Sequence, residues 1–259
     1  MISRFILLIS LCLMLPPSLY AEKGWQEQKG SNFIIYYRDI PEDFLETVME
    51  EAEEEYRRIS ENIGIGSYRS WAWDKRASIY IYKDAEDYVK NGGQAGWSHG
   101  AALVKTKVIK TFPSASGFFD SILPHELGHI ILHEFVGSHA DIPLWFDEGV
   151  AMNQEKARRL GSHALVKTAI EKGQFIPLTQ LTDMRLYSNS DQATVELFYA
   201  ESASAVNFMM TQLGAERFHQ FCRELKGNAR FEDVLVKVYM SLKGMDDLNR
   251  KWKNFLEEQ

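Results

Sequence analysis

Cysteine is almost absent from this 259-residue chain, which contains only Cys12 and Cys222. Cys12 lies in an apolar run at the N-terminus that we expect to be removed, so Cys222 has no partner for an intramolecular disulfide. A structural zinc site built from cysteine pairs is also excluded. The fold must therefore be stabilised by its core, and Cys222, among apolar residues at helical spacing, is interpreted as a buried, unreactive thiol.

Positive charge is also scarce. Lys and Arg number 29 against 36 Asp and Glu, which gives a formal net charge of −7, and the sequence contains no basic patch. This balance argues against nucleic acid or an anionic membrane surface as the main partner. Internal repeats and low-complexity tracts are missing as well, and the hydrophobic content of 45% is typical of a globular protein with a sizeable core.

Long hydrophobic runs are missing except near the N-terminus. There the run at 5–15 covers about 11 residues, well short of the roughly 20 needed to cross a bilayer. Arg4 precedes the run, Pro16-Pro17 ends it, and Ala21 is a small residue suited to cleavage. The pattern predicts a signal peptide at residues 1–21, with an uncleaved anchor as the alternative. The remaining chain is expected to be periplasmic or secreted, without a membrane span.

The remaining chain has strand patterns first and helical patterns later. The expected strands are 33–37, 77–82, 101–104 and 108–111, and the expected helices are 42–62, 122–135, 143–160, 194–213, 215–226, 231–242 and 246–257. This order predicts one α+β domain at 22–259. Its parts are a strand-containing N-terminal lobe at 22–137 and a helical lobe at 138–259.

Several helix ends are marked by the sequence. We expect Gly64, Gly137 and Gly161 to end the first three helices. Asp120 or Ser121 is expected to cap the helix at 122–135, with Pro124 in its first turn, where a missing N–H costs little. The glutamate-rich run at 50–55 is interpreted as a solvated helix face.

The sequence HELGH at 125–129 places two histidines four residues apart on one of these helices. Residues at this spacing differ by about 40° in direction around the helix, so both imidazoles reach one ion. Zinc in a catalytic site takes three protein ligands, so a third ligand must come from another element. Glu148 follows His129 by 148 − 129 = 19 positions, which leaves room for the chain to reverse. Glu126 is offset from the pair, which suits a carboxylate that contacts water rather than metal.

HELGH at 125–129 followed by WFDEG at 145–149 resembles the gluzincin metallopeptidases, of the thermolysin and aminopeptidase N type, and particularly their bacterial peptidase MA-like relatives. The strict resemblance covers about 30 residues. It implies a zincin-like α+β fold, with a small mixed β-sheet in the N-terminal lobe, an active-site helix and a helical C-terminal lobe. It also implies one zinc ion, with His125, His129 and Glu148 as ligands and Glu126 as general base.

The activity implied by this resemblance is hydrolysis of peptide bonds. Zinc lowers the pKa of a bound water toward about 7, Glu126 takes the proton, and the hydroxide attacks a peptide carbonyl. The developing oxyanion needs another donor. By resemblance, Tyr199 in the sequence LFYAESASAVNFM at 197–209 is the first candidate and His219 the second, with a packed helix position as the alternative for both. We expect an endopeptidase that acts on peptides or proteins.

Two departures from the family pattern limit what is carried over. The sequence Gly-x-Met-x-Asn, which holds a free substrate amine in the aminopeptidase branch, is absent, so exopeptidase specificity is not supported. Met152 stands where thermolysin-like enzymes have an aspartate that orients a zinc histidine. Asn153, Glu155 and Asp147 are the alternative supports for the zinc ligands.

Three further histidines have weaker claims to a role. His133 continues the same helix face but lies about 12 Å along the axis from His125, too far to share an ion, so core packing or a surface role is expected. His139 would be a ligand only if the third ligand were assigned wrongly. His99, in a glycine-rich loop, is a candidate for facing substrate. The strand at 101–104 is expected at a sheet edge, where it can pair with an extended peptide.

Two other functions use the same residues. One is a catalytically silent binding or envelope-assembly module on a zincin scaffold, against which the intact Glu126 argues. The other is a zinc hydrolase acting on a non-peptide amide. Cobalt or manganese fits similar ligands, but two imidazoles and one carboxylate favour zinc.

Overall fold

The computed structural model describes residues 24–65, 75–92, 100–115, 117–137, 140, 142–156, 161–187, 190–227 and 229–258. The signal peptide expected at 1–21 lies outside these residues, as do His99 and His139. None of the helices in the described ranges is long and apolar enough to cross a membrane.

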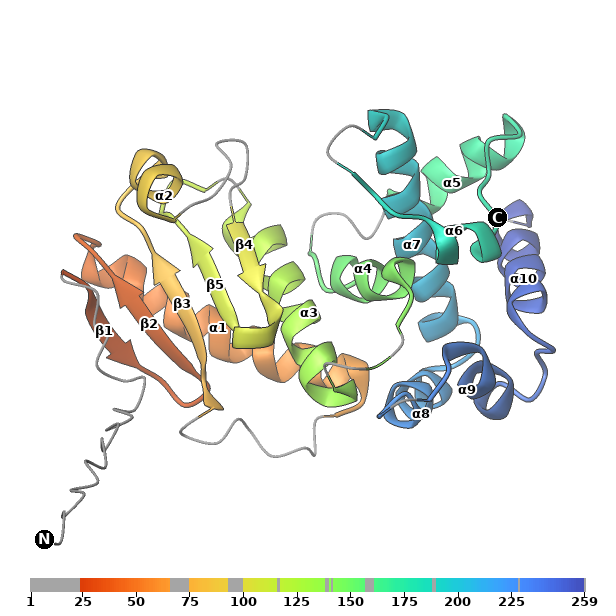
Figure 1. Ribbon diagram of the computed structural model, residues 1–259, viewed down its shortest axis with the longest axis horizontal. Helices are drawn as coiled ribbons and strands as arrows, with labels where there is room; N and C mark the ends of the chain where they lie inside the picture. Colours follow the sequence, from red (N-terminus) through yellow and green to blue (C-terminus); the bar gives the residue numbers. More distant parts are fainter. Residues whose placement is uncertain are drawn as a thin grey trace, which may run out of the picture.

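A five-stranded mixed sheet forms the N-terminal lobe, as expected (Figure 1). Its strands are β1 (Gln26–Lys29), β2 (Phe33–Tyr37), β3 (Ala77–Ile81), β4 (Gly100–Leu103) and β5 (Val108–Thr111), in the spatial order β1-β2-β3-β5-β4. The central strands β2, β3 and β5 run parallel, and both edge strands pair antiparallel. β1 was not expected, because its sequence QEQK is polar and it joins the sheet through backbone pairing with β2.

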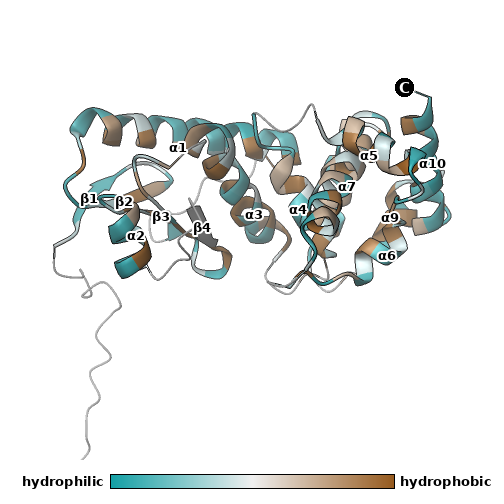
Figure 2. Cartoon of the chain, turned by 90° about the horizontal axis from the view of Figure 1, so that it is seen from above, coloured by the Kyte–Doolittle hydropathy of each residue, from teal (hydrophilic) through white to brown (hydrophobic). Residues whose placement is uncertain are grey.

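Two long helices, α1 (Glu42–Ile63) and α3 (Leu123–Val136), lie side by side on one face of the sheet (Figures 1 and 2). Alternate strand residues, including Phe33, Ile35 and Ile79, are buried. α3 also contacts the edge strand β4. The sheet therefore supports the HELGH helix from behind and places β4, an edge strand among the described residues, beside it.

α1 ends where expected, at Gly64, which has a φ of +83° and donates its N–H to the carbonyl of Glu61. The interpretation of the glutamate run as a solvated face is wrong for Glu55, whose side chain is only 1% exposed. Its carboxylate forms ion pairs with Arg58 on the same helix and with Lys156, which follows α4 in the chain. The charge is buried because two cations neutralise it.

α3 begins directly after a π-helical turn at Phe118–Ile122. The expected cap by Asp120 or Ser121 is therefore wrong: Ile122 is the N-cap and makes no side-chain capping bond. Pro124 lies in the first turn and Gly137 ends the helix, as expected. An apolar stripe runs along the helix: Leu127, Ile130, Ile131 and Phe135 are buried, and Ile122 is partly buried.

The second central helix is shorter than the sequence pattern predicts. α4 (Leu144–Met152) ends eight residues before Leu160, and Gly161 precedes the next helix, α5 (Ser162–Glu171). The reason is Asn153, whose side-chain amide donates to the carbonyls of Gly149 and Ala203. The bond to Gly149 satisfies a carbonyl of the last helical turn, and the tertiary bond to Ala203 on α7 holds the chain where the helix stops.

The rest of the chain is helical, as expected. The helices are α6 (Leu178–Asp183), α7 (Gln192–Thr211), α8 (Ala215–Glu224), α9 (Phe231–Val238) and α10 (Met245–Glu257). The last four match the expected ranges except that α9 ends at Val238 rather than at 242. The short α5 and α6, and α2 (Ala85–Gly92) in the N-terminal lobe, were not expected.

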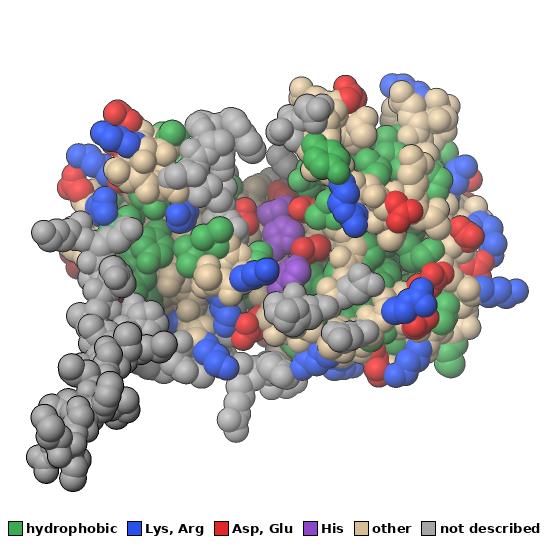
Figure 3. All heavy atoms as spheres, in the orientation of Figure 1, with side chains coloured by type: hydrophobic (Ala, Val, Ile, Leu, Met, Phe, Trp, Pro, Cys, Tyr) green, Lys and Arg blue, Asp and Glu red, His purple; other side chains and the backbone are tan. Residues whose placement is uncertain are grey.

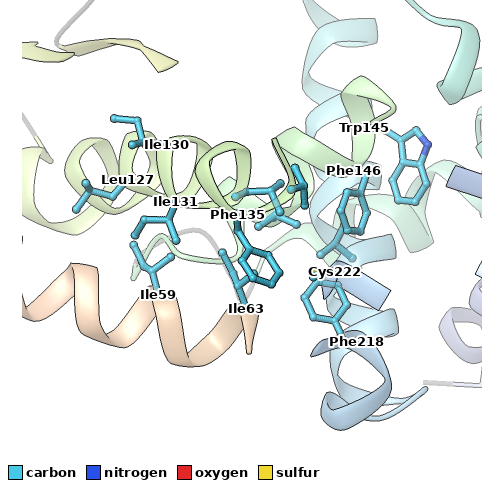
Figure 4. Close-up of a cluster of buried hydrophobic side chains, with 14 of the residues drawn as sticks. Ile59, Ile63, Leu127, Ile130, Ile131, Phe135, Trp145, Phe146, Phe218 and Cys222 are labelled. Carbon is cyan, nitrogen blue, oxygen red and sulfur yellow. The ribbon is translucent and has the colours of Figure 1, made fainter. Parts of the chain in front are cut away.

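One cluster of buried hydrophobic side chains extends through both lobes (Figure 4). Ile59 and Ile63 of α1 face Ile131 and Phe135 of α3, and Phe146 of α4 lies near Phe218 of α8. Cys222 is fully buried in this core, and burial raises the pKa of its thiol. The interpretation of Cys222 as a buried thiol is confirmed.

Candidate metal centre

Three side chains from two helices converge at the junction of the lobes. His125 and His129 of α3 and Glu148 of α4 each direct one ligand atom toward the others, all within 4.8 Å. The two Nε2 atoms lie 3.2 Å apart, and each lies 3.5 Å from Glu148 Oε2. In the space-filling view, histidine side chains occupy a hollow between the lobes (Figure 3). The chain reversal expected between His129 and Glu148 is therefore present.

Two glycines allow these helices to come this close. A Cβ on Gly128, in the HELGH sequence, would lie 2.9 Å from the Cα of Ala151 on α4. A Cβ on Gly149, directly after Glu148, would lie 2.4 Å from the carbonyl oxygen of Ser202 on α7. α4 is thus packed between α3 and α7 at distances that only glycine permits on these faces.

Each histidine of the cluster is held from behind by a carboxylate. His125 Nδ1 lies 2.9 Å from Glu155 Oε1, and His129 Nδ1 lies 2.8 Å from Asp147 Oδ1. When Nδ1 donates its proton to a carboxylate, the Nε2 lone pair is left to face a cation. Of the three supports considered from the sequence, Glu155 and Asp147 contact the histidines, whereas Asn153 binds backbone carbonyls.

The carboxylates make the cluster favourable for positive charge. Burial opposes protonation of His125, but hydrogen bonds to Glu148 and Glu155 outweigh it and raise the pKa of His125 to about 9. The pKa of His129 is raised well above its usual value in the same way, by Asp147 and Glu148. Conversely, burial raises the pKa of Glu148, but the two imidazoles lower it to about 2.

The donor set fits a zinc ion. Atoms bound tetrahedrally to one zinc at about 2.0–2.1 Å lie about 3.3–3.4 Å from one another. The three separations between the donor atoms of His125, His129 and Glu148 are 3.2, 3.5 and 3.5 Å. Two imidazoles and one carboxylate, each imidazole supported by a second carboxylate, are also the chemistry that a catalytic zinc requires.

Glu126 follows His125 on α3 and is partly buried. Its negative charge is one of the smaller contributions that raise the pKa of His125. It is not one of the three side chains that converge. This position agrees with the offset expected from the helix geometry.

The two oxyanion candidates lie in different places. Tyr199 is on α7, one turn before Ser202, whose backbone contacts Gly149 beside Glu148. Its ring is partly buried and packs edge-on against Phe198. His219 is on α8 and packs over Gly64 at the end of α1, so its ring covers the helix cap rather than the cluster.

His133 was not expected to contact any residue of the metal site. Its Nε2 lies 2.7 Å from Asp147 Oδ2, so one carboxylate contacts both His129 and His133. The interpretation as core packing or a surface role is wrong in this respect. The available signal was the four-residue spacing of the two histidines, which a single acidic side chain from the facing helix can bridge.

A cavity of about 490 Å³ opens beside Asp147 at the start of α4. Its wall combines apolar side chains, among them Ile142 and Phe231, with charged side chains of both signs: Arg185, Arg230, Asp183 and Glu232. This size and mixture of walls are typical of a site that accepts part of a small organic ligand or peptide.

A family model described as the Peptidase MA superfamily matches residues 67–258. No curated protein matches the chain. The solved structure of native yeast LTA4 hydrolase is similar with a TM-score of 0.50 and 15% identity, covering 87% of this chain and 38% of that chain. At this identity the likeness concerns the fold alone.

Other solved structures match less well. Yeast LTA4 hydrolase in complex with bestatin has a TM-score of 0.48 and 14% identity, over 86% of this chain and 37% of that one. A mutant M1 zinc metallopeptidase from Deinococcus radiodurans has a TM-score of 0.43 and 14% identity, over 88% of this chain and 52% of that one. The chain thus spans between 37% and 52% of the length of these solved chains.

Proposed function

The chain belongs to the Peptidase MA superfamily, and from this premise we propose that it is a zinc-dependent metallopeptidase that cleaves within peptides or proteins. The observation that carries the proposal is the triangle of donor atoms from His125, His129 and Glu148, whose sides of 3.2, 3.5 and 3.5 Å match the edges of a zinc tetrahedron. The three residues are the proposed ligands of one zinc ion.

Bound there, zinc supplies a Lewis acid that polarises a substrate carbonyl and lowers the pKa of water. The protein positions this chemistry. Glu155 and Asp147 accept the Nδ1 protons of the ligand histidines, which fixes both rings with Nε2 toward Glu148. Glu126 is the proposed general base: its carboxylate takes a proton from the attacking water and returns it to the leaving nitrogen.

Tyr199 is the proposed donor to the oxyanion that forms on the carbonyl oxygen. Its place on α7, one turn from the contact between Ser202 and Gly149, supports this role. Packing of His219 over Gly64 makes it the weaker candidate. A phenol hydroxyl near the reacting carbonyl stabilises charge that develops only in the transition state.

An extended peptide is the substrate that the surroundings favour. β4 is an edge strand that contacts α3, so its outer edge offers backbone groups to a peptide lying along the HELGH helix. The cavity beside Asp147 accepts substrate side chains on the helical side. The chain lacks a Gly-x-Met-x-Asn sequence for a free amine, which supports endopeptidase over exopeptidase action.

We also propose that residues 22–259 act as one catalytic domain, because the proposed ligands lie on both sides of the lobe boundary at 137–138. The apolar run at 5–15 supports export to the periplasm or the medium, with cleavage after Ala21.

Replacement of Glu126 by Gln tests the proposal. Wild-type protein is expected to bind one zinc per chain and to hydrolyse an internally quenched peptide library. Glu126→Gln should keep the zinc and lose about 10²- to 10⁴-fold in kcat/KM, because the base is removed and the ligands remain. Glu134→Gln, on the same helix in an ion pair with Lys107, is the matched control and should keep full activity.

Retained hydrolysis in Glu126→Gln would overturn the base assignment. Zinc bound without hydrolysis of any peptide by the wild type would favour the silent binding module. Absence of stoichiometric zinc in the wild type would remove the metallopeptidase proposal.

A further inference from the structure

The carboxylate of Asp147 makes two short contacts with α3. Oδ1 lies 2.8 Å from His129 Nδ1, and Oδ2 lies 2.7 Å from His133 Nε2. His129 and His133 are one helical turn apart and project from the same face. One oxygen of Asp147 therefore faces a proposed zinc ligand, and the other faces a histidine outside the ligand set.

The two carboxylates that support the ligand histidines differ in how they are held. Glu155 is 3% exposed and follows a segment fixed to α1, where Arg58 and Asn62 bind Gln154. Asp147 is 18% exposed, sits in the first turn of α4 and borders the cavity. A carboxylate in this position can rotate toward solvent unless a second group binds it.

His133 is the group that binds the second oxygen. Oδ2 of Asp147 accepts from His133 Nε2 at 2.7 Å while Oδ1 accepts from His129 Nδ1 at 2.8 Å, so α3 engages both oxygens of the carboxylate. Both contacts are partly shielded from water, which strengthens them relative to exposed hydrogen bonds. Asp147 is thus fixed in orientation by the same helix that carries the proposed ligands.

We propose that His133 is a positioning residue of the metal centre: by holding Oδ2 of Asp147, it keeps Oδ1 on His129 Nδ1 and so keeps His129 Nε2 directed at the zinc. This inference rests on the proposed function, since it gives His133 a role only through a zinc ligand. It adds a residue beyond the supports considered from the sequence. It also explains how this side of the cluster is held although Asp147 lies beside a cavity.

Zinc affinity, measured by competition with a chromogenic chelator, tests the proposal. His133→Leu removes the donor and should weaken zinc binding about 3- to 10-fold, at or below the lower end of the 10- to 100-fold range for a direct support of a ligand. His133→Gln keeps an N–H where Nε2–H was and should restore affinity to within about twofold. Glu134→Gln, at the next position of α3, should leave the affinity unchanged.

A double-mutant cycle separates positioning from general stability. Asp147→Ala should weaken zinc binding by itself, and adding His133→Leu should then have no further effect, because His133 acts through Asp147. Thermal unfolding of the metal-free variants monitors the fold. If His133→Leu does not fold, the comparison of His133→Gln with His133→Ala gives the same test.

The outcomes distinguish this proposal from the proposed function. Wild-type protein that does not bind zinc, or that retains it in His129→Ala, contradicts the metal centre itself. If zinc binding requires His129 but is unchanged in His133→Leu, the metal centre stands and only the positioning role of His133 is overturned. Equal losses from His133→Leu with and without Asp147 do so as well.

Discussion

The two ends of α4 contribute to the proposed metal centre in different ways. Toward its start, Asp147 borders a cavity and, like Glu148, is partly exposed, and Pro143 provides no side-chain cap. Past its end, Asn153 and Glu155 are buried and bound on several sides. The start lies beside a cavity, whereas the segment past the end is buried.

Hydrogen bonds account for the rigidity of the end. Asn153 Nδ2 donates to the carbonyls of Gly149 and Ala203, and Asn207 Nδ2 donates to Asn153 Oδ1. Arg58 of α1 donates to the carbonyl of Gln154 at 2.7 Å. A single nine-residue helix and the turn after it thus supply one proposed ligand and both carboxylates behind the histidines. The geometry of the centre depends on where this helix lies.

The largest effect on stability and zinc binding is expected from a substitution that displaces the whole of α4. In Gly149→Ala the new Cβ would lie 2.4 Å from the Ser202 carbonyl oxygen, a backbone atom that cannot move aside. We expect a loss of about 3 kcal/mol in the free energy of unfolding, the upper part of the range for overpacking, together with loss of zinc. Urea denaturation of the metal-free protein measures the first and chelator competition the second.

Gly161→Ala is the control for this substitution. Gly161 has a φ of −94°, and no atom of the described residues lies within 4 Å of the place that the new methyl group would take, so stability should change by less than about 0.5 kcal/mol. A Gly149→Ala variant as stable as this control would show that α4 and α7 do not pack as closely as described.

The next largest effect is on zinc affinity, and it differs between the two ends of α4. Glu155→Ala should weaken zinc binding about 100-fold and Asp147→Ala about 10-fold, the two limits expected for supports of a metal ligand. Water can take the place of Asp147, which is 18% exposed, but is excluded from the place of Glu155, which is 3% exposed. Chelator competition on both variants gives the ratio, and equal losses would contradict the distinction between an open start and a buried end.

The parts of the centre that the sequence predicts are those set by local geometry. His125 and His129 share a helix face because they are four residues apart, and Glu148 follows within one chain reversal. The strands β2, β3 and β5 and most of the long helices were predicted for the same reason, since their apolar periodicity is local. The ligand roles themselves remain proposals.

The parts that the sequence does not predict are set by contacts between distant residues. α4 ends because Asn153 binds the carbonyl of Ala203, 50 positions away. Glu55 is buried because Lys156 and Arg58 neutralise it, and only one of these is on its own helix. Glu155, and not Asn153, contacts His125 because α4 ends at Met152. The spacing of these residues in the sequence does not predict where the helix ends.

On α7, the helix packed against α4, burial favours a protonated carboxyl group, whereas Glu148 of α4 is held ionised. Glu201 of α7 is fully buried, and burial raises its pKa from 4.5 to about 8, against the lowering effect of the Ile176 N–H. At pH values between about 4.5 and 8, Glu201 is protonated in the folded protein but ionised in the unfolded chain. Stability therefore falls as pH rises from about 4.5 to about 8, by at most about 1.4 kcal/mol per pH unit.

Glu201→Gln should remove this decline and make the protein up to about 4 kcal/mol more stable than the wild type at pH 8, with little difference near pH 4.5. Urea denaturation of metal-free protein at both pH values provides the measurement. A difference that does not depend on pH would mean that Glu201 is ionised in the folded state, like the carboxylates of α4.

The smallest effect is expected at Lys156, on the surface of the buried end. Its Nζ lies 3.2 Å from Glu55 and 3.3 Å from Glu51, but the side chain is 45% exposed. Lys156→Met should cost less than about 1 kcal/mol, as for other exposed ion pairs. Zinc affinity should change less than about threefold, because Arg58 still neutralises Glu55 and still binds Gln154.

Lys237→Met is the matched control, since Lys237 forms a 2.8 Å ion pair with Glu224 between α8 and α9. It should leave zinc binding unchanged. If Lys156→Met instead weakens zinc binding tenfold while the control does not, the ion pairs with α1, rather than Asn153 and Arg58, hold the end of α4 in place. The buried end would then depend on surface charge, and raising the salt concentration should weaken zinc binding of the wild type in the same way.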